Sequence, residues 1–286
     1  MKTYLISIII AAYNEEKYIE TCLHSLTQQD YPHIEIIVVD DGSSDKTVDR
    51  IAYVVSHVKQ IRQIELIQLN HQGTAIARNT AAKAAKGNIL VFLDADMNFE
   101  KDFIRKLVSP IVENKTKGTF SKLEYVKNWN KALARCWNRN NNPPLPDTLR
   151  VPQDIELGDD FRAILKSEFL RVGGFDNTGY TDTWTLHQKL GYRPTNAPDA
   201  QYYHYNPESL SEIFHSARWI GRRRYKLGRI GTTLTIFKRL PIFSLFRGVT
   251  KSIQYHELSF IPFFFAYDWG ILNGALSSLL GGEVRK

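Results

Sequence analysis

Two acidic residues separated by one position, Asp94 and Asp96, directly follow the apolar run 89–93. Side chains at positions i and i+2 of an extended segment point the same way, so we expect the two carboxylates to emerge together. Carboxylates held this close repel each other unless a positive charge lies between them. A hard divalent cation suits such a place, and Mg²⁺ binds one or two carboxylates together with substrate phosphates. For so short a pattern, the alternative is a pair of solvated acids in a turn.

The first half of the chain alternates between segments with strand patterns and segments with helix patterns. This alternation predicts βαβ units and a mainly parallel sheet. The apolar run near the N-terminus has the outline of a signal peptide, but it is short and no cleavage pattern follows it, so we interpret it as a buried first strand. The expected strands are 5–11, 34–39, 64–68 and 89–93, and the expected helices are 16–28, 46–57 and 74–84.

Polar clusters follow three of these strands, at 13–15, 40–45 and 94–96. In open sheets of this kind, ligands bind beyond the carboxyl ends of the strands. Three clusters on one edge therefore predict a ligand site there. Within the second cluster, Ser43 or Ser44 is expected to cap the helix that opens at Lys46.

The composition is that of a globular protein, with 286 residues, 43% hydrophobic and 23% charged. Two cysteines, Cys22 and Cys136, are too few for a disulfide framework or a zinc site. The formal net charge is +7, and basic residues concentrate between Arg218 and Arg239, where no acid occurs. Such a stretch is typical of a solvated helix face, a nucleic-acid site or a site for an anionic membrane surface.

Apolar and aromatic segments follow this basic stretch, at 241–246 and 260–267. The run that continues to residue 280 has about the length of a transmembrane helix, but Pro262, Asp268 and Asn273 interrupt it. Basic residues beside aromatic surface favour a membrane interface over nucleic acid. We therefore expect a membrane surface and no nucleic acid as partner, with a buried helical tail as the alternative.

Four motifs in this chain together resemble those of the family 2 glycosyltransferases, which have the GT-A fold. The resemblance covers residues 4 to about 205 and is carried by residues 11–16, 38–47, 73–79 and 94–96. It implies an α/β fold of the GT-A class, with a Rossmann-like, mainly parallel sheet and flanking helices.

The same resemblance implies a catalytic domain over residues 1–207. Its nucleotide-binding half is expected over about 1–98 and its acceptor half over about 99–207. Residues 208–286 form the expected helical, basic and apolar C-terminal region that associates with a membrane.

A nucleotide-sugar donor, UDP- or GDP-linked, follows from the resemblance. Glu15 and Asp40 or Asp41 are acceptors at strand ends for base N–H groups or ribose hydroxyls, although loop acids also cap helices. Arg78 lies about one turn into a helix whose N-terminal amides favour anions. The expected nucleotide-binding residues are Ala12, Tyr13, Glu15, Asp40, Asp41, Gly73, Arg78 and Asp94.

The resemblance also implies a Mg²⁺ or Mn²⁺ ion. Asp96 is the expected direct ligand, and Asp94 is expected to hold the ribose or to reach the metal through water. Asn98 lies where one branch of the family carries a further polar residue, and His204 occupies a place comparable to that of a third ligand. A histidine between tyrosines is equally often a packed core residue.

Inverting sugar transfer needs a general base that deprotonates the acceptor hydroxyl. In the family this base is an acid in a Glu-Asp-like pair shortly after a motif like the one at 173–176. Asp182 is the only acid in that stretch after Asp176, so it is the expected base, and a threonine replaces the second acid. Either Asp182 acts alone, or the acceptor is a phosphate that needs no strong base. Asp159 and Asp160 are the reserve candidates, or they cap the following helix.

Residues 215–219 resemble the Gln-x-x-Arg-Trp element of processive members, with His215 in place of the glutamine, which leaves processivity open. Arg218 is expected to pair with the leaving diphosphate and Trp219 to stack on a sugar; in the alternative they belong to a basic face and a core. The expected acceptor and diphosphate contacts are Asp176, Trp184, Arg218 and Trp219.

Taken together, these features predict a metal-dependent, inverting glycosyltransferase on the inner face of the cell membrane, cytoplasmic and peripheral. Its acceptor is expected to be a lipid-linked sugar, a polyprenyl phosphate or a glycan. A nucleotidyltransferase on a similar sheet is one alternative, but a Gly-rich, Lys-bearing phosphate loop is missing near the N-terminus. A catalytically inactive relative is the other, and the intact Asp94, Asp96 and Asp182 argue against it.

Overall fold

The structure is a computed structural model that describes residues 4–57, 63–140, 145–178, 182–222, 225 and 228–280. The chain divides into two compact units. The first unit combines residues 1–125, 151–177 and 182–204, and the second combines 126–150, 178–181 and 205–286. The functional division at residue 207 stays a prediction.

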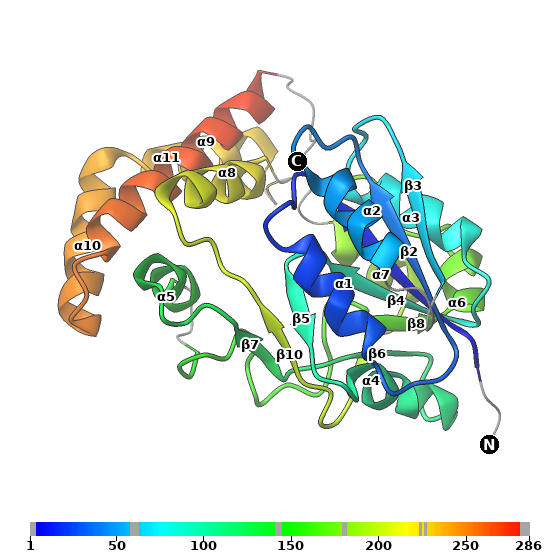
Figure 1. The fold of residues 1–286 in the computed structure, drawn as a ribbon. Helices are drawn as coiled ribbons and strands as arrows, with labels where there is room; N and C mark the ends of the chain where they lie inside the picture. Colours follow the sequence, from blue (N-terminus) through cyan, green and yellow to red (C-terminus); the bar gives the residue numbers. More distant parts are fainter. Residues whose placement is uncertain are drawn as a thin grey trace. The chain divides into compact units, whose positions relative to one another are not determined.

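A seven-stranded sheet forms the centre of the first unit (Figure 1), with the strand order β3-β2-β1-β4-β8-β6-β9. Its first four strands in the chain pair in parallel, so the predicted mainly parallel sheet is confirmed. β8 runs antiparallel to both β4 and β6, and β9 pairs in parallel with β6. The strands are β1 (Ile6–Ala12), β2 (Ile34–Asp40), β3 (Gln63–Gln68), β4 (Ile89–Asp94), β6 (Gly118–Phe120), β8 (Ala163–Leu165) and β9 (Thr195–Asn196).

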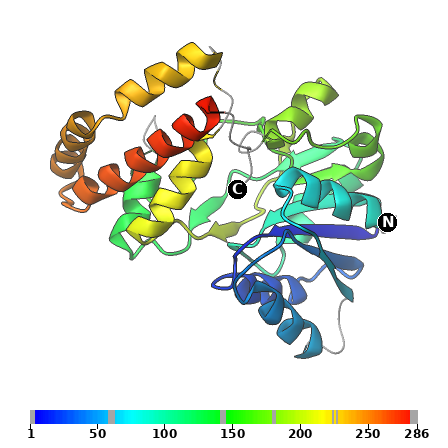
Figure 2. The same ribbon diagram turned by 90° about the horizontal axis from the view of Figure 1, so that it is seen from above.

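Helices cover both faces of this sheet. Because successive residues of a strand face opposite sides, Ile8 and Ile10 of β1 join one buried cluster and Ile9 joins the other. The first cluster is covered by α1 (Ile19–Thr27), α2 (Thr47–His57) and α4 (Phe103–Val112). The second is covered by α3 (Thr74–Ala84), α6 (Lys166–Arg171) and α7 (Asp182–Leu190). In Figure 2, α1 and α2 lie on one side of the sheet and α3 on the other.

A smaller, three-stranded sheet has the order β5-β10-β7, with β5 (Met97–Phe99), β10 (Tyr202–His204) and β7 (Glu124–Val126). β5 begins shortly after the end of β4, and it pairs antiparallel with β10 so that Met97 lies opposite His204. This pairing brings a segment from the end of the first unit back to the acidic residues that follow β4.

The second unit is helical in its described part: α5 (Ala132–Arg139), α8 (Leu210–Gly221), α9 (Gly228–Lys238), α10 (Pro241–Tyr255) and α11 (Phe260–Leu279). α8 and α11 pack with their backbones in contact, because a Cβ added to Gly270 or Gly274 would collide with the backbone of α8. No helix of the described residues combines the length and the apolar character needed to cross a membrane.

Candidate functional site

The carboxyl ends of β1, β2 and β4 lie side by side. The strand register sets Ala12 opposite Asp40 on one side of β1, and Ala11 opposite Asp94 on the other. All three strands are buried over almost their whole length, so the sheet holds these ends rigidly. The edge at which the sequence predicts a ligand site is thus built from three adjacent strands.

The loops that follow β1 and β2 are tied together by hydrogen bonds. The backbone N–H of Asn14 donates to the Ser43 hydroxyl at 2.9 Å, and the Ser44 N–H donates to the Asn14 side-chain oxygen at 2.9 Å. The N-terminus of α2 is capped by Asp45, which accepts from the Thr47 N–H at 3.0 Å. The expectation that a serine caps this helix is therefore wrong, because both serines face the β1 loop instead.

Asp41 organises the loop between β3 and α3. Its carboxylate accepts hydrogen bonds from the backbone N–H groups of Gln72 and Gly73, both at 2.8 Å, and it lies 2.9 Å from Nδ1 of His71. The carboxylate is buried and already engaged by these groups. Asp41 therefore holds the start of α3 and the loop before it in place.

Asp40 is placed differently from its neighbour. One of its carboxylate oxygens accepts from the Ser43 N–H at 3.2 Å. The other oxygen, Oδ1, is buried and has no hydrogen-bond partner among the residues that the structure describes. An unsatisfied buried acceptor is unfavourable, so Oδ1 of Asp40 is suited to an N–H donor supplied by a ligand.

An aromatic pair stands beside these acids. The rings of Tyr13 and His71 are stacked, with centroids 4.2 Å apart and planes 21° apart. The loop after β2 approaches the backbone of His71 closely at Gly42, whose φ of 78° is left-handed. A Cβ added to Gly42 would lie 2.8 Å from the backbone nitrogen of His71. Sequence reasoning missed His71, because nothing in its local pattern distinguishes it from other loop residues.

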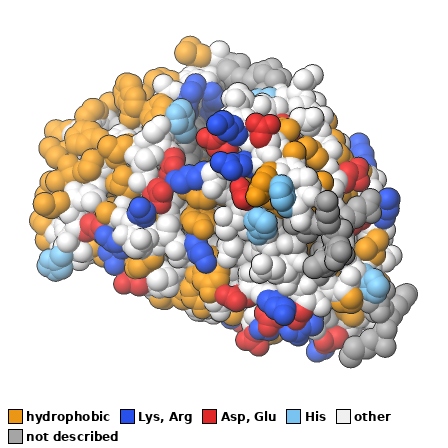
Figure 3. Space-filling model, in the orientation of Figure 1, with side chains coloured by type: hydrophobic (Ala, Val, Ile, Leu, Met, Phe, Trp, Pro, Cys, Tyr) orange, Lys and Arg blue, Asp and Glu red, His pale blue; other side chains and the backbone are white. Residues whose placement is uncertain are grey.

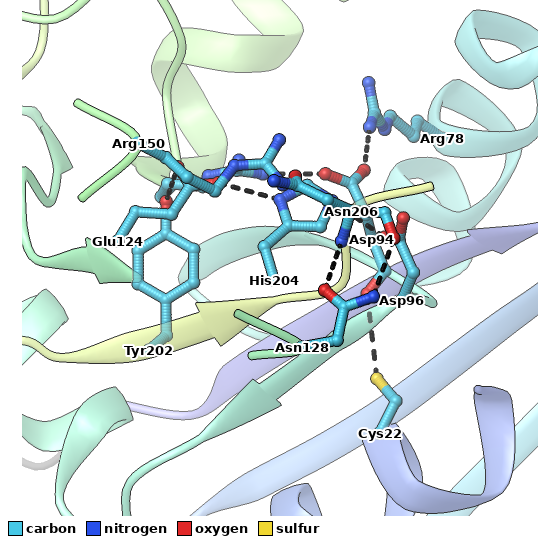
Figure 4. Close-up of polar contacts among 11 residues, drawn as sticks. Cys22, Arg78, Asp94, Asp96, Glu124, Asn128, Arg150, Tyr202, His204 and Asn206 are labelled. Atoms are coloured by element: carbon cyan, nitrogen blue, oxygen red, sulfur yellow. Dashed lines mark hydrogen bonds and ion pairs between the residues drawn. The ribbon is translucent and has the colours of Figure 1, made fainter. Parts of the chain in front are cut away.

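Asp94 is held between two arginines, of which Figure 4 labels Arg78. Nη2 of Arg78 lies 2.6 Å from one carboxylate oxygen, and Nη1 of Arg162 lies 3.1 Å from the other. Burial alone would raise the pKa of Asp94, but the charges of Arg162 and Arg78 outweigh it and hold the pKa well below its usual range. The positive charge expected beside the two acids is thus supplied at Asp94 by guanidinium groups. Arg162, on the segment before β8, was not singled out from the sequence.

Asp94→Asn is expected to lower the free energy of unfolding by about 1–3 kcal/mol at pH 7, because two arginines lose the charge that they contact. The folded pKa lies below the unfolded one, so this stabilisation is present above about pH 4 and is lost as the pH falls toward the folded value. Urea unfolding at pH 7 and pH 3, followed by circular dichroism, should show a smaller deficit at pH 3. Asp147→Asn, at an exposed ion pair with Arg139, is the matched control and should change little. If Asp94→Asn lowers the free energy of unfolding equally at pH 7 and pH 3, this account is contradicted.

Asp96 faces His204, which β10 places beside it. Nε2 of His204 lies 3.0 Å from Oδ1 of Asp96, and Nδ1 lies 2.7 Å from Oε1 of Glu124. The Tyr202 hydroxyl donates to the other Glu124 oxygen at 2.7 Å, so the buried Glu124 holds the imidazole in one orientation. A histidine that binds a metal commonly shows this arrangement, with one ring nitrogen fixed by a carboxylate and the other turned toward the ion.

The donor groups Asp96 and Nε2 of His204 suit a divalent ion that takes its remaining ligands from substrate phosphates and water. Among the described ranges, no group of three or more histidine, cysteine or acidic side chains is arranged to hold a metal. Asn98 lies opposite Tyr203 in the β5–β10 ladder, and its neighbours Met97 and Phe99 are buried in the core. Glu124 was not predicted from the sequence.

The thiol of Cys22 is buried below the acids that follow β4. Its pKa is raised well above the usual value, first by burial and then by the carboxylates of Asp96, Asp94 and Glu15. The Cys22 sulfur lies 3.7 Å from the backbone oxygen of Asp94. Acids predicted from two motifs, 11–16 and 94–96, therefore raise the pKa of one buried thiol.

The glycine-rich motif before α7 is tied to α3. The Asn79 side chain donates to the Phe175 carbonyl at 2.8 Å and accepts from the Phe175 N–H at 3.0 Å. Asp176, which follows, is exposed and contacts Lys189 at 2.8 Å. Trp184 on α7 is partly exposed. Asp182 is the first residue of α7, and its side chain lies outside the described part of the structure.

The two reserve acids differ in their surroundings. Asp159 is exposed and pairs with Arg193. Asp160 is hydrogen-bonded to Thr183, and its Oδ1 is buried without a hydrogen-bond partner in the described ranges. Burial raises the pKa of Asp160, although the charge of Arg162 opposes this. Arg218 and Trp219 lie on α8 in the second unit, and their roles stay predictions.

The sheet order, the helices on both faces and the acids at the strand ends define the GT-A class of transferases. The sequence model described as "Glycosyl transferase family 2" matches residues 7–165, which is more than half of the chain. The chain therefore belongs to glycosyl transferase family 2, and the predicted family, fold and enzyme class are confirmed.

Two curated relatives illustrate the match. The putative glycosyltransferase EpsH of Bacillus subtilis (strain 168) is 36% identical over 108 residues, which are 38% of this chain and 30% of EpsH. WfaP of Escherichia coli, a UDP-Glc:α-D-GlcNAc-diphosphoundecaprenol β-1,3-glucosyltransferase, is 44% identical over 92 residues, which are 32% of this chain and 35% of WfaP. The matched stretch thus spans about a third of each relative.

A solved structure extends the likeness of fold to almost the whole chain. The mannosyltransferase PcManGT from Pyrobaculum calidifontis, in complex with GDP-Man and Mn²⁺, superposes with a TM-score of 0.58 at 20% identity. The match covers 98% of this chain and 75% of PcManGT. At this identity the likeness shows the fold alone.

Proposed function

We propose that this chain is a metal-dependent, inverting glycosyltransferase that moves a sugar from a UDP- or GDP-linked donor to a lipid-linked, polyprenyl-phosphate or glycan acceptor. The observation that carries the proposal is the 3.0 Å contact of Asp96 with Nε2 of His204, beside Asp94 at the end of β4. The activity in the name of WfaP supports a lipid-linked acceptor, and the PcManGT complex supports a divalent metal.

The nucleotide is proposed to bind at the ends of β1 and β2. Oδ1 of Asp40 accepts a base N–H, which uracil and guanine both offer, while the Tyr13–His71 pair supplies an aromatic surface beside it. Glu15 and Asp94 are the acceptors for ribose hydroxyls. The N-terminal amides of α3, which follow Gly73, favour the diphosphate.

The metal is proposed to be Mg²⁺ or Mn²⁺, held by Asp96 and His204, with Asn98 as a further polar group near them. When bound, the ion neutralises the charge that grows on the leaving diphosphate. Glu124 contributes by fixing the ring of His204, and the two arginines fix Asp94. The proposed metal ligands thus belong to the segment after β4 and to the smaller sheet that follows it.

Asp182 is the proposed general base. The acceptor oxygen attacks the anomeric carbon as the bond from that carbon to the diphosphate oxygen breaks, and the hydroxyl proton passes to the carboxylate. The partly exposed Trp184 and Asp176 lie on or just before the same helix and are proposed to contact the acceptor. Arg218 and Trp219 are proposed to contact the leaving diphosphate and a sugar. The enzyme is proposed to work as a peripheral protein on the inner face of the cell membrane.

The proposed activity is tested by screening UDP- and GDP-sugars with Mg²⁺ or Mn²⁺. A ligand that binds only the native state raises the melting temperature, and released nucleotide then reports turnover. We expect one donor class to give both signals. If no donor shifts the melting temperature and none is turned over with either metal, the proposed activity fails.

Asp40→Asn is expected to weaken nucleotide binding about tenfold, because a neutral amide oxygen replaces a charged acceptor. Isothermal titration of the preferred nucleotide in the absence of metal measures this effect. Asp154→Asn, at an exposed acid of the same unit, is the control and should leave the Kd unchanged. Equal Kd values for Asp40→Asn and the wild type would remove Asp40 from the base site.

A further inference from the structure

The amphipathic character of α10 is reversed. The residues that it buries are Ser244, Gly248 and Ser252, which are small or polar and recur at every fourth position. A Cβ added to Gly248 would lie 2.9 Å from the Ile261 Cα, so this small-residue face packs closely on α11. The large apolar side chains of α10 therefore point outward, opposite to the arrangement in an ordinary soluble helix.

The outward face of α10 carries a continuous apolar stripe. Ile242, Phe246 and Ile253 are 72%, 71% and 70% exposed, respectively. α9 shows the same reversal, because it buries Thr232 and exposes Ile230, Leu234 and Phe237 at helical spacing. Figure 3 shows hydrophobic side chains gathered over α10. Soluble monomers seldom expose so many large apolar side chains side by side, so we expect a partner to cover this surface.

A buried ion cluster fixes this arrangement. Asp268 of α11 is fully buried and accepts hydrogen bonds from Arg239, which follows α9, at 2.6 Å and from Arg247 of α10. The guanidinium of Arg247 also lies over the Phe264 ring. The charges of Arg239 and Arg247 are thus paired in the interior, while large apolar side chains of α9 and α10 stay exposed.

The charge of this region favours an anionic partner. Residues 213–256 contain ten lysines and arginines and no aspartate or glutamate. Arg229 and Lys238 are exposed near the two ends of α9, at the borders of its apolar stripe. A second copy of this chain would set two faces of the same sign against each other. Anionic headgroups above an apolar layer match both features of the surface.

The lengths of the two helices limit how they meet a bilayer. α9 has 11 residues and α10 has 15. At 1.5 Å per residue these helices are about 16 and 22 Å long, short of the roughly 30 Å hydrocarbon core. They can lie in the plane of the interface with their apolar faces buried among the lipids.

We propose that the outward faces of α9 and α10 form a membrane-docking surface that inserts into the interface of bilayers containing anionic lipid. The surface comprises Ile230, Leu234, Phe237, Ile242, Leu245, Phe246, Val249 and Ile253, with Arg229 and Lys238 at its border. This inference deepens the peripheral location given under the proposed function and rests on it, but it does not require that the chain transfer sugar.

The test is flotation of the full chain with vesicles of phosphatidylcholine, with or without phosphatidylglycerol. The wild type is expected to float with the anionic vesicles. The double variant Phe246→Ser/Ile253→Ser should partition about tenfold more weakly or worse, because two large side chains no longer bury apolar area. Leu170→Ser, at an exposed leucine of α6, is the matched control and should float like the wild type.

A second variant separates the charge from the apolar contact. Arg229→Gln/Lys238→Gln should lower partition to anionic vesicles about tenfold or more and leave partition to neutral vesicles nearly unchanged. Circular dichroism checks that each variant folds, and nucleotide release without lipid shows whether the enzyme proposal stands independently. Failure of the wild type to float with either vesicle overturns the proposal. So does a dimer in analytical ultracentrifugation that Phe246→Ser/Ile253→Ser abolishes, which assigns the surface to a second copy.

Discussion

Asp96→Asn is expected to lower kcat/KM for sugar transfer by about 10³-fold or more, because the metal loses its charged ligand and the leaving diphosphate loses several kcal/mol of stabilisation. A neutral amide then replaces the carboxylate beside His204. Nucleotide binding without metal should be little changed, since Asp40 ends β2 and the Tyr13–His71 pair lies in the loops after β1 and β3, apart from Asp96. Mn²⁺ binding, measured by electron paramagnetic resonance with the nucleotide present, should weaken in step with activity.

Glu124→Gln provides a graded comparison for this prediction. Glu124 contacts the imidazole and not the ion, so its loss should weaken Mn²⁺ binding about 10–100-fold, less than the loss of Asp96. Asp102→Asn, at a surface ion pair with Lys106, is the control. Its kcat/KM and its Mn²⁺ affinity should equal those of the wild type. Unchanged Mn²⁺ affinity in Asp96→Asn would place the metal elsewhere and withdraw the proposed site.

Much of the first unit could be predicted from the sequence because its elements are determined by local pattern. The helix expected over 74–84 is found at those bounds, and the four expected strands differ from the observed ones by a residue at one or both ends. Parallel strands buried on both faces are continuous apolar runs, and these runs dominate β1, β2 and β4. The ends of such strands indicate where polar clusters meet.

The partners of the acids could not be predicted in the same way. Arg162 reaches Asp94 across 68 positions, and Glu124 reaches His204 across 80, through strands too short to show a pattern. The sequence also left Asp40 and Asp41 equivalent, whereas the structure uses Asp41 to hold a loop and leaves an oxygen of Asp40 without a partner among the described residues. These distinctions depend on tertiary contacts, which spacing along the chain does not encode.

The C-terminal helices illustrate a further limit. The basic stretch 218–239 and the aromatic segments 241–246 and 260–267 indicated an interfacial region, but composition does not say which side of each helix faces the protein. The small residues Ser244, Gly248 and Ser252 determine that side in α10, because only they allow α11 to approach. A conventional amphipathic interpretation would have buried the residues that the structure exposes.

Asp182→Asn is expected to lower kcat by about 10²–10⁴-fold, with little change in donor KM or in Mn²⁺ affinity, because the base acts on the acceptor proton only in the transition state. Steady-state kinetics with the preferred donor, together with Mn²⁺ titration, measures the three quantities. A fall in kcat alone supports a base, whereas a matching loss of Mn²⁺ affinity would assign Asp182 to the metal. Asp159→Asn removes another acid of this region, at the exposed pair with Arg193, and is the control that should change kcat far less.

Comparing Asp160→Asn with Asp182→Asn tests whether Asp182 is the general base. The carboxyl of Asp160 is hydrogen-bonded to Thr183, which follows Asp182 at the start of α7. A threonine stands there in place of the second acid of the family pair, so Asp160 lies close to the position of that missing acid. If Asp182 is the base, Asp160→Asn should reduce kcat far less than Asp182→Asn. If Asp160 is the base, the order reverses, and activity in the wild type falls as the pH drops through its pKa, which burial raises above the usual range of aspartate. In that case Asp160→Asn removes this acidic limb of the pH profile, and Asp182→Asn retains it.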